Sequence, residues 1–225
     1  MKQARSSEHT MVPGLANRRV RRKLRTRQAL LDAGHSLLAS RSIDALSVDE
    51  IAMSADVGKG TFYNYFADKD ELTRELAAQV RMYLTDEISK TNQGVEDPAL
   101  RIARAFCWVL RFGFSDPRRA AALMRLFPHA MDPEAPFNVG VRKDVATGLA
   151  RGRLVAPTED IAIAAIVGVC IAGLNRVVEL SPGLAREFAG ELGTILLHGL
   201  GLSRTEAGRI LRIATKSIFD RKKEQ

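Results

Sequence analysis

Helix-start signals stand close together in the first third of this sequence, and they constrain how the chain folds. Ser47-Val48-Asp49-Glu50 is a capping box, in which the Ser47 hydroxyl accepts the N–H of Glu50 and the Glu50 carboxylate accepts the N–H of Ser47. A second cap places Asp68 at an N-cap with Glu71 three residues later. The segment between these caps has room only for short helices.

The segment between the caps divides into two short helices. The first runs from Ser47 to about Ala55, where Asp56-Val57-Gly58 interrupts it. The second spans Lys59 to Phe66, and a long helix then continues to about Lys90. Two short helices joined by a tight turn, with an earlier helix packed across both, form a helix-turn-helix.

Helical periodicity continues through the rest of the chain, so the sequence predicts an all-α fold. We expect a disordered basic arm over residues 1–20, a three-helix helix-turn-helix domain over 21–90 with its motif at about 47–66, and a helical domain over 95–225. The turn cluster TNQGVEDP marks the boundary between the two domains. The predicted helices beyond it are Pro98 to Ser115, Pro117 to Phe127, Asn138 to Arg151, Thr158 to Leu180, Leu184 to Leu200 and Ser203 to Phe219.

Positive charge is concentrated near the N-terminus. The 225 residues carry a formal net charge of +8, which favours an anionic partner. Arg18 to Arg27 holds seven basic side chains in ten positions, whereas Gln28 to Asn92 has six basic residues against eleven acidic ones. Such a block is either a solvated tail or a segment that lies along phosphates or in a minor groove. We expect Arg25, within this block, to contact DNA.

Several classes of protein lack support in the sequence. Cys107 and Cys170 stand in apolar stretches without metal-type spacing, so we expect no disulfide scaffold, no metal site and no cofactor. We find no nucleophile with its base, which argues against an enzyme. The apolar stretch Ile161 to Leu174 is shorter than the roughly 20 residues that span a membrane. With no secretory signal, a cytoplasmic location is expected.

The second short helix has a polar outer face. Phe62 and Phe66 are four residues apart and are expected to point inward. The polar and aromatic side chains between them are then left toward solvent, where an Asn can bind adenine and Lys or Tyr can bind phosphate. The residues expected at DNA are Ser47, Val48, Lys59, Thr61, Tyr63, Asn64, Tyr65 and Lys69.

These residues resemble a known family. The run VGKGTFYNYFADKDEL is similar to the N-terminal domain of TetR-family transcriptional regulators, and the resemblance covers roughly Arg22 to Met82. It implies a homodimer that binds a palindromic operator in double-stranded DNA, with Gly60 allowing close approach of the backbone. Asp56 stands where the family commonly has a turn Gly, and Gly58 stands where Ser or Thr often caps the recognition helix.

The resemblance also implies a small-molecule effector that binds in the C-terminal domain and releases a repressor from DNA. Alternatives are an activator or a ligand-independent regulator of the same fold, or a small-molecule-binding or membrane-associated helical protein without DNA function. The segments in which the family builds its effector cavity contain Phe106, Leu110, Phe114, Met124, Phe127, Phe137 and Cys170.

Two neighbouring helices of the C-terminal domain carry a face suited to self-association. Small residues on the first helix permit the close approach of another helix, and apolar residues on the next helix extend the same surface, which predicts a four-helix interface between two subunits. The residues expected in this interface are Ala165, Gly168, Ala172, Gly173, Leu192, Ile195 and Leu196.

Overall fold

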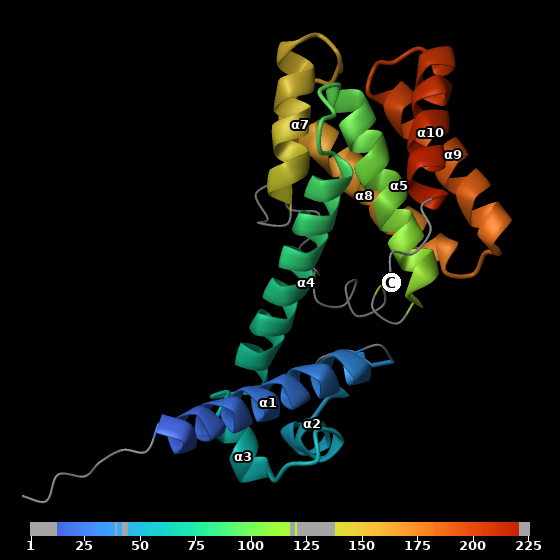
Figure 1. Ribbon diagram of the computed structural model, residues 1–225. Coiled ribbons are helices and arrows are strands. Elements are labelled where there is room, and N and C mark those ends of the chain that lie inside the picture. The colour runs from blue at the N-terminus through green and yellow to red at the C-terminus, as the bar shows by residue number, and fades with distance from the viewer. Residues whose placement is uncertain (1–12, 39, 42–44, 118–119, 121–137, 221–225) are drawn as a thin grey trace, which may run out of the picture.

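The computed structural model describes residues 13–38, 40–41, 45–117, 120 and 138–220 of the chain. Every regular element in those ranges is helical, which confirms the predicted all-α fold (Figure 1). The helices are α1 (Pro13–Leu38), α2 (Val48–Ser54), α3 (Lys59–Tyr63), α4 (Lys69–Thr91), α5 (Pro98–Ser115), α7 (Val139–Ala150), α8 (Glu159–Val177), α9 (Pro182–Gly199) and α10 (Arg204–Phe219).

The first three helices and the start of α4 enclose a small hydrophobic core at one end of the molecule (Figure 1). Gly34 of α1 lies against α4, where an added Cβ would sit 2.8 Å from Leu76 Cδ1, so the two helices cross closely. Phe62 is fully buried and Phe66 is 1% exposed. The inward orientation predicted for both phenylalanines is therefore confirmed. The buried residues of this core are Leu30, Leu31, Ala33, Leu38, Leu46, Ile51, Ala52, Phe62, Phe66, Leu72 and Leu76.

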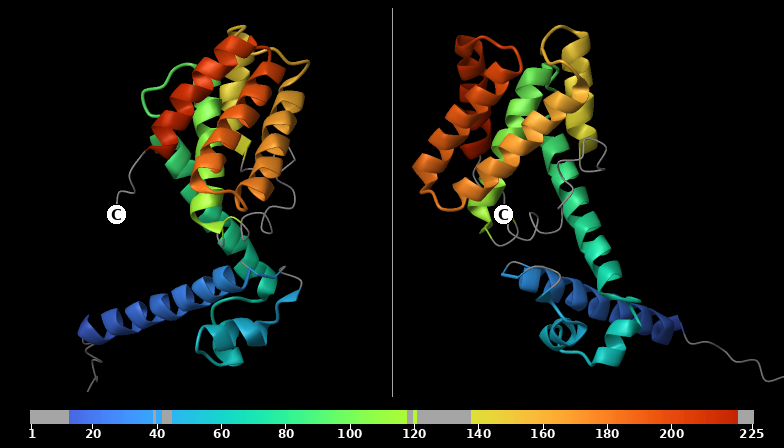
Figure 2. Two further views of the ribbon diagram at one scale, coloured as in Figure 1. Left: turned by 90° about the vertical axis from the view of Figure 1, so that its right-hand side faces the viewer. Right: turned by 180° about the vertical axis from the view of Figure 1, so that it is seen from behind.

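The remaining helices form a second, larger core at the other end of the molecule (Figure 2). Helix α5 is its central element and packs against α7, α8, α9 and α10. Its apolar positions recur on most of its circumference, so Phe106 and Leu110 are almost entirely buried. Gly193 of α9 allows α10 to pack closely, because a Cβ there would lie 2.5 Å from Leu211 Cδ1.

Helix α4 belongs to both cores. Leu72 and Leu76 near its N-terminus are fully buried in the first core, and Leu84 is buried in the second. Val80, between them, packs against both cores. Figure 1 shows α4 rising from α1 to the C-terminal helices. It is the long element through which the two ends of the molecule are mechanically joined.

Helix α1 begins earlier than the sequence predicted. It starts at Pro13, so the expectation of a disordered arm is wrong for residues 13–20, while residues 1–12 lie outside the described part of the chain. The physical reason is twofold: proline is favoured at the first helical position, and the Arg, Lys and Leu residues that follow are good helix formers. Most of the predicted helix from Pro117 to Phe127 also lies outside the described residues.

Candidate nucleic-acid interface and ligand cavity

Helix α2 begins at the predicted capping box. The Ser47 hydroxyl accepts the N–H of Glu50 at 3.2 Å, and the Glu50 carboxylate accepts the N–H of Ser47 at 2.9 Å. Arg41 donates to the same carboxylate at 2.7 Å. The Ser47 N–H and the Arg41 guanidinium together lower the pKa of Glu50 to about 2. The start of the helix-turn-helix is thus fixed by local hydrogen bonds.

A left-handed residue makes the turn between α2 and α3. Asp56 has φ of 54°, in the region that Asp tolerates better than most residues. The chain reverses there, and the N–H of Val57 donates to the Ala52 carbonyl at 3.0 Å. Gly58, at the N-cap of α3, makes no side-chain cap bond. Helix α3 therefore begins without the hydroxyl cap that Ser or Thr would supply.

Helix α3 is shorter than predicted. The sequence predicts a helix from Lys59 to Phe66, but α3 ends at Tyr63, and Asn64 is its C-cap. The N–H of Asn64 bonds to the Thr61 carbonyl three residues back, at 3.2 Å, so the last turn tightens. Tyr and Asn have low helix propensity, which favours this early end. The aromatic segment is a short helix followed by a turn.

The outward face of α3 and its turn carries polar and aromatic side chains. Tyr63 is 51% exposed, and its ring meets the buried Phe62 ring edge-on with centroids 5.5 Å apart. Asn64 is exposed, whereas Thr61 and Tyr65 are half-buried, and Tyr65 packs against the N-terminal core. An added Cβ at Gly60 would meet no atom within 4 Å apart from its chain neighbours and the backbone of its own helix. The backbone is consequently accessible to a partner at that position.

The predicted phosphate-binding lysines already have partners within the chain. Lys59 Nζ lies 2.8 Å from an Asp49 carboxylate oxygen, and this hydrogen bond raises the pKa of Lys59. Lys69 Nζ donates to the Leu46 carbonyl at 3.0 Å, which ties the start of α4 to the segment before α2. An ammonium has three donors, so Lys59 retains donors for a phosphate. Val48, half-buried in the first turn of α2, lies beside Ser47.

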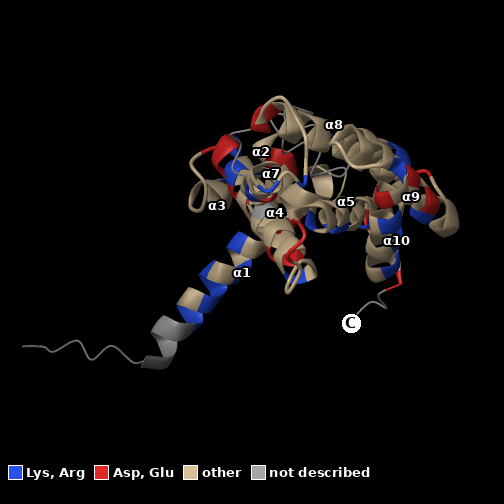
Figure 3. Cartoon of the chain, turned by 90° about the horizontal axis from the view of Figure 1, so that it is seen from above, with Lys and Arg blue, Asp and Glu red and all other residues tan. Residues whose placement is uncertain are grey.

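The strongest positive charge near this interface lies on α1. Figure 3 shows α1 extending away from the body of the molecule, with Lys and Arg positions (blue) recurring along it. Every residue from Arg18 to Arg25 is exposed. Arg27, the next basic residue, instead pairs with Glu75 of α4 through two hydrogen bonds, and its guanidinium lies 5.1 Å from the centre of the Phe66 ring.

A cavity of about 330 Å³ lies between α4, α5, α7 and α8 in the C-terminal domain. Of the residues that the sequence suggested for an effector pocket, Phe106 and Cys170 line this cavity. Leu110 is buried and faces Gly173, and Phe114 is half-buried against the core, so neither is among the lining residues. Met124, Phe127 and Phe137 lie outside the described part of the chain.

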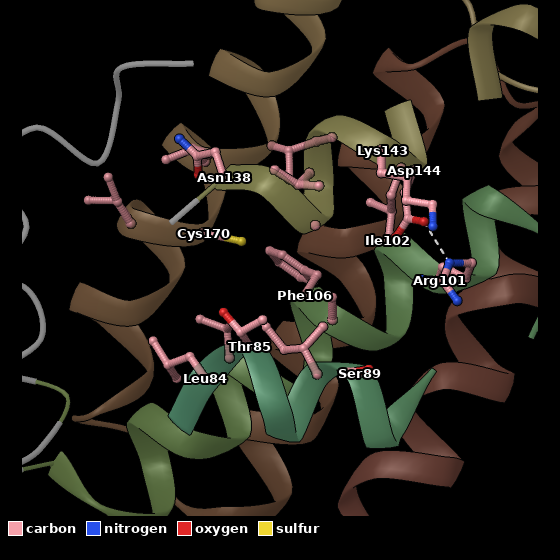
Figure 4. Close-up of a pocket in the computed structure, with 18 of the residues that line it drawn as sticks. Leu84, Thr85, Ser89, Arg101, Ile102, Phe106, Asn138, Lys143, Asp144 and Cys170 are labelled. Atoms are coloured by element: carbon pink, nitrogen blue, oxygen red, sulfur yellow. Dashed lines mark hydrogen bonds and ion pairs between the residues drawn. The ribbon is translucent and has the colours of Figure 1, made fainter. Parts of the chain in front are cut away.

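Sequence reasoning missed the polar side chains of this cavity. Arg101 of α5 and Asp144 of α7 are joined by a hydrogen bond of 2.6 Å from Nε to Oδ1. Figure 4 shows this pair on one side of the cavity and Asn138 with Cys170 on another, with Phe106 between them. Burial raises the pKa of the Cys170 thiol to about 12, so it is a neutral wall group. No local motif marks these residues, because they come from separate helices.

The predicted dimer face is only partly exposed. Ala165 and Ala172 of α8 are exposed, Gly168 is half-buried, and Ile195 of α9 is 63% exposed. The remaining three residues face inward: Gly173 and Leu196 are buried in their own subunit, and half-buried Leu192 lies against Gly173. The inclusion of Gly173 and Leu196 in the face is a correction, because both are buried within the subunit, where Gly173 serves close packing of α8 with α5 and α9; the place of Leu192 in the face stays a prediction.

Helix α8 is apolar beyond the needs of the subunit's own core. It is long and apolar enough to cross a membrane by length and composition alone, yet a core helix of a soluble protein passes the same test. Only 39% of its most apolar window is buried inside the subunit.

Within the described residues, no group of three or more His, Cys, Asp or Glu side chains is arranged to hold a metal ion.

Comparison with known proteins gives a family match for the N-terminal domain. The family described as "Bacterial regulatory proteins, tetR family" matches residues 30–76. An uncharacterized HTH-type transcriptional regulator of Haemophilus influenzae is 31% identical over 83 residues, which are 36% of this chain and 40% of that protein. The match with this curated relative thus spans less than half of its length.

Solved structures share the fold over most of the chain. RolR in complex with resorcinol is 24% identical, covers 85% of this chain and 95% of its own, and has a TM-score of 0.56. A gamma-butyrolactone receptor described as ArpA-like is 16% identical, covers 89% of this chain and 99% of its own, and has a TM-score of 0.64. At these identities the likeness shows the fold, which includes both the helix-turn-helix and the C-terminal helices.

Proposed function

This chain belongs to the TetR family of transcriptional regulators, as its sequence predicted, and from that premise we propose that it is a sequence-specific DNA-binding regulator. It acts in the cytoplasm as a homodimer on a palindromic duplex operator. It represses transcription until a small molecule bound in its C-terminal domain releases it from DNA.

The observation that carries this proposal is the polar face of α3 above a closed core. Tyr63 and Asn64 stand in solvent while the neighbouring Phe62 is fully buried, so the segment is held rigidly with its outer side free. In a major groove the Asn64 amide bonds to a base edge, and the Tyr63 hydroxyl bonds to a phosphate. Gly60 leaves room for the DNA backbone at the start of the helix.

A dimer follows from the short reach of α3. One helix of this length contacts few base pairs, whereas two copies set about 34 Å apart, or a multiple of that distance, read both halves of a palindrome. The exposed apolar residues Ala165, Ala172 and Ile195 support an interface built from α8 and α9 of both subunits. Burial by a second copy also accounts for the apolar surface that α8 leaves uncovered.

Ligand control is supported by the position of the cavity. Helix α4 forms one wall through Leu84, Thr85, Ile88 and Ser89, and the same helix enters the core of the DNA-binding domain. A molecule that binds better when α4 is displaced favours the displaced state and so changes the separation of the two recognition helices. RolR, which shares the fold, has been solved with resorcinol bound.

Footprinting of the purified protein on the DNA that flanks its own gene tests this function. We expect a protected palindrome, and the duplex that contains it should bind more tightly than a scrambled duplex of the same length and composition. Equal binding of both duplexes would contradict sequence-specific regulation. Flotation with anionic vesicles tests the membrane alternative, for which we expect no association.

A further inference from the structure

The cavity between α4, α5, α7 and α8 is mainly apolar, and its polar lining residues are Thr85, Ser89, Arg101, Asn138, Lys143 and Asp144. Its walls include Ile102, Phe106, Val109, Ile166 and Val167, which offer no hydrogen bonds from their side chains. Its volume of about 330 Å³ is at the lower end of the range for small-molecule sites. The bulk of any molecule that fills it must therefore be apolar and compact.

Asp144 is the most buried charged group on the cavity wall. It is 8% exposed, and its Oδ1 accepts a hydrogen bond from Arg101 Nε at 2.6 Å. Burial raises the pKa of this carboxyl, and the adjacent Arg101 partly opposes the shift. A carboxylate has about four acceptor sites. One bond to one oxygen leaves it able to accept a further hydrogen bond from a molecule in the cavity.

Arg101 links this carboxylate to the end of α4. Its Nη1 donates to the carbonyls of Asn92 and Val95, each at 3.2 Å, and Asn92 is the C-cap of α4. The Asn92 side chain donates back to the Arg101 carbonyl at 3.1 Å. A change in the hydrogen bonding of Asp144 therefore alters the position of the Arg101 guanidinium. The same guanidinium holds the turn that follows α4.

Charge on the cavity wall decides what kind of polar group fits beside Asp144. An anionic group has to lie close to the Asp144 carboxylate and lose its hydration, and both effects oppose binding. A cationic group faces Arg101 and Lys143, which also line the cavity, and it too must be desolvated. An uncharged donor pays the smallest desolvation cost and still supplies a hydrogen bond to a charged acceptor.

We propose that this cavity binds an uncharged, largely apolar molecule whose hydroxyl group donates a hydrogen bond to Asp144. Through Arg101, this hydrogen bond also changes the contacts at the C-terminal end of α4. The inference rests on the proposed regulatory function and names the ligand class of the same site. Binding of the ligand by the protein without DNA is a separate property from operator binding.

Calorimetric titration of the full-length protein, without DNA, tests the ligand class with three probes of one shape. 2-Naphthol, which is uncharged at neutral pH, should bind at least about tenfold more tightly than naphthalene, because it adds one hydrogen bond to a charged group. 2-Naphthoate should bind more weakly than 2-naphthol. Equal affinities for 2-naphthol and naphthalene, or tightest binding of 2-naphthoate, would overturn the proposal.

The variant Asp144→Asn tests the acceptor itself. Arg101 retains the amide oxygen as its partner, so the amide NH₂ replaces the oxygen available to the ligand. The preference for 2-naphthol over naphthalene should then fall severalfold, while naphthalene binding is kept. Asp160→Asn, which makes the same change at an exposed α8 residue outside the cavity lining, is the control and should keep the full preference.

The outcomes separate this proposal from the proposed function. If Asp144→Asn does not fold, the comparison of the three probes with the unaltered protein still decides the ligand class. An unchanged preference in a folded Asp144→Asn variant would refute the role of Asp144. Failure of the protein to bind any specific operator would remove the regulatory function but would leave the selectivity among the three probes to be measured.

Discussion

Removal of the basic face of α1 should weaken the salt dependence of DNA binding. Positions i, i+3, i+4 and i+7 of a helix share one face, and on α1 this spacing brings together Arg18, Arg21, Arg22 and Arg25. All four side chains are exposed, and the helix extends beyond the rest of the molecule (Figure 3). Segments 47–66 and 68–70 contribute more acidic than basic residues, so we expect α1 to supply most of the phosphate contacts.

The expected magnitude follows from counterion release. Each phosphate contact contributes about 0.9 to the slope of log K against log salt concentration. The variant R18Q/R21Q/R22Q/R25Q should therefore reduce the slope by up to about 3.6 for each subunit if all four arginines reach phosphates. Fluorescence anisotropy with the footprinted duplex, at several salt concentrations, measures this slope directly.

A matched variant separates local contacts from net charge. R186Q/R204Q/R209Q/R212Q removes the same four charges from exposed positions on α9 and α10, in the C-terminal domain. It should leave the slope nearly unchanged, since α9 and α10 lie at the opposite end of the molecule from α2 and α3 (Figure 1). An unchanged slope in the α1 variant, or an equal decrease in both variants, would refute the assignment of α1 to DNA.

Three further variants test the helix-turn-helix itself. Tyr63→Ala should weaken operator binding several-fold, while thermal denaturation shows a loss of less than about 1 kcal/mol, because the side chain is half exposed. Phe62→Ala should lower the free energy of unfolding by about 3–5 kcal/mol, because that side chain is fully buried. The rate of hydrogen exchange should rise over residues 30–76 and not over α10. A uniform rise along the chain would contradict two separate cores. Glu50 has its pKa lowered to about 2 by the Ser47 N–H and Arg41, so its contribution to stability is complete above its ordinary pKa of 4.5 and is lost as the pH falls toward 2. Glu50→Gln should remove that acid dependence from hydrogen exchange at the start of α2, and an identical pH profile in variant and parent would exclude this role.

Local hydrogen-bonding rules predicted the helix starts well. Ser47, Asp68 and Ser203 each accept the N–H of the residue three positions later, as their sequence pattern predicted. Ser203-Arg204-Thr205-Glu206 has the same capping-box pattern as Ser47 to Glu50, but its reciprocal half is not formed, because the Glu206 carboxylate pairs with Arg153 at 2.7 Å. A cap depends on four neighbouring residues, so it is readable from sequence, whereas the competing partner of Glu206 comes from a distant segment.

The cavity and the dimer face were harder to predict for the same reason. Gly173 fits a small-residue stripe equally well whether the stripe faces another subunit or the subunit's own α5, and periodicity alone does not choose between them. The pair of Arg101 and Asp144 joins residues 43 positions apart on different helices. The two side chains come together only when α5 packs against α7, so no spacing in the sequence predicts the pair.

The division of α4 between two cores has a consequence for any signal that passes between them. Leu72 and Leu76 hold its first half against α1, and the part-buried ion pair of Glu75 with Arg27 adds a polar contact, with the Arg27 guanidinium also lying over the Phe66 ring. Close-packed contacts of this kind do not stretch; they either move together or break. In the proposed regulation, a displacement of α4 at the cavity would therefore move α1 and the turn after α3 together with it. This is how, in that regulation, a ligand that never approaches DNA alters the spacing of the two recognition helices of a dimer without unfolding either one.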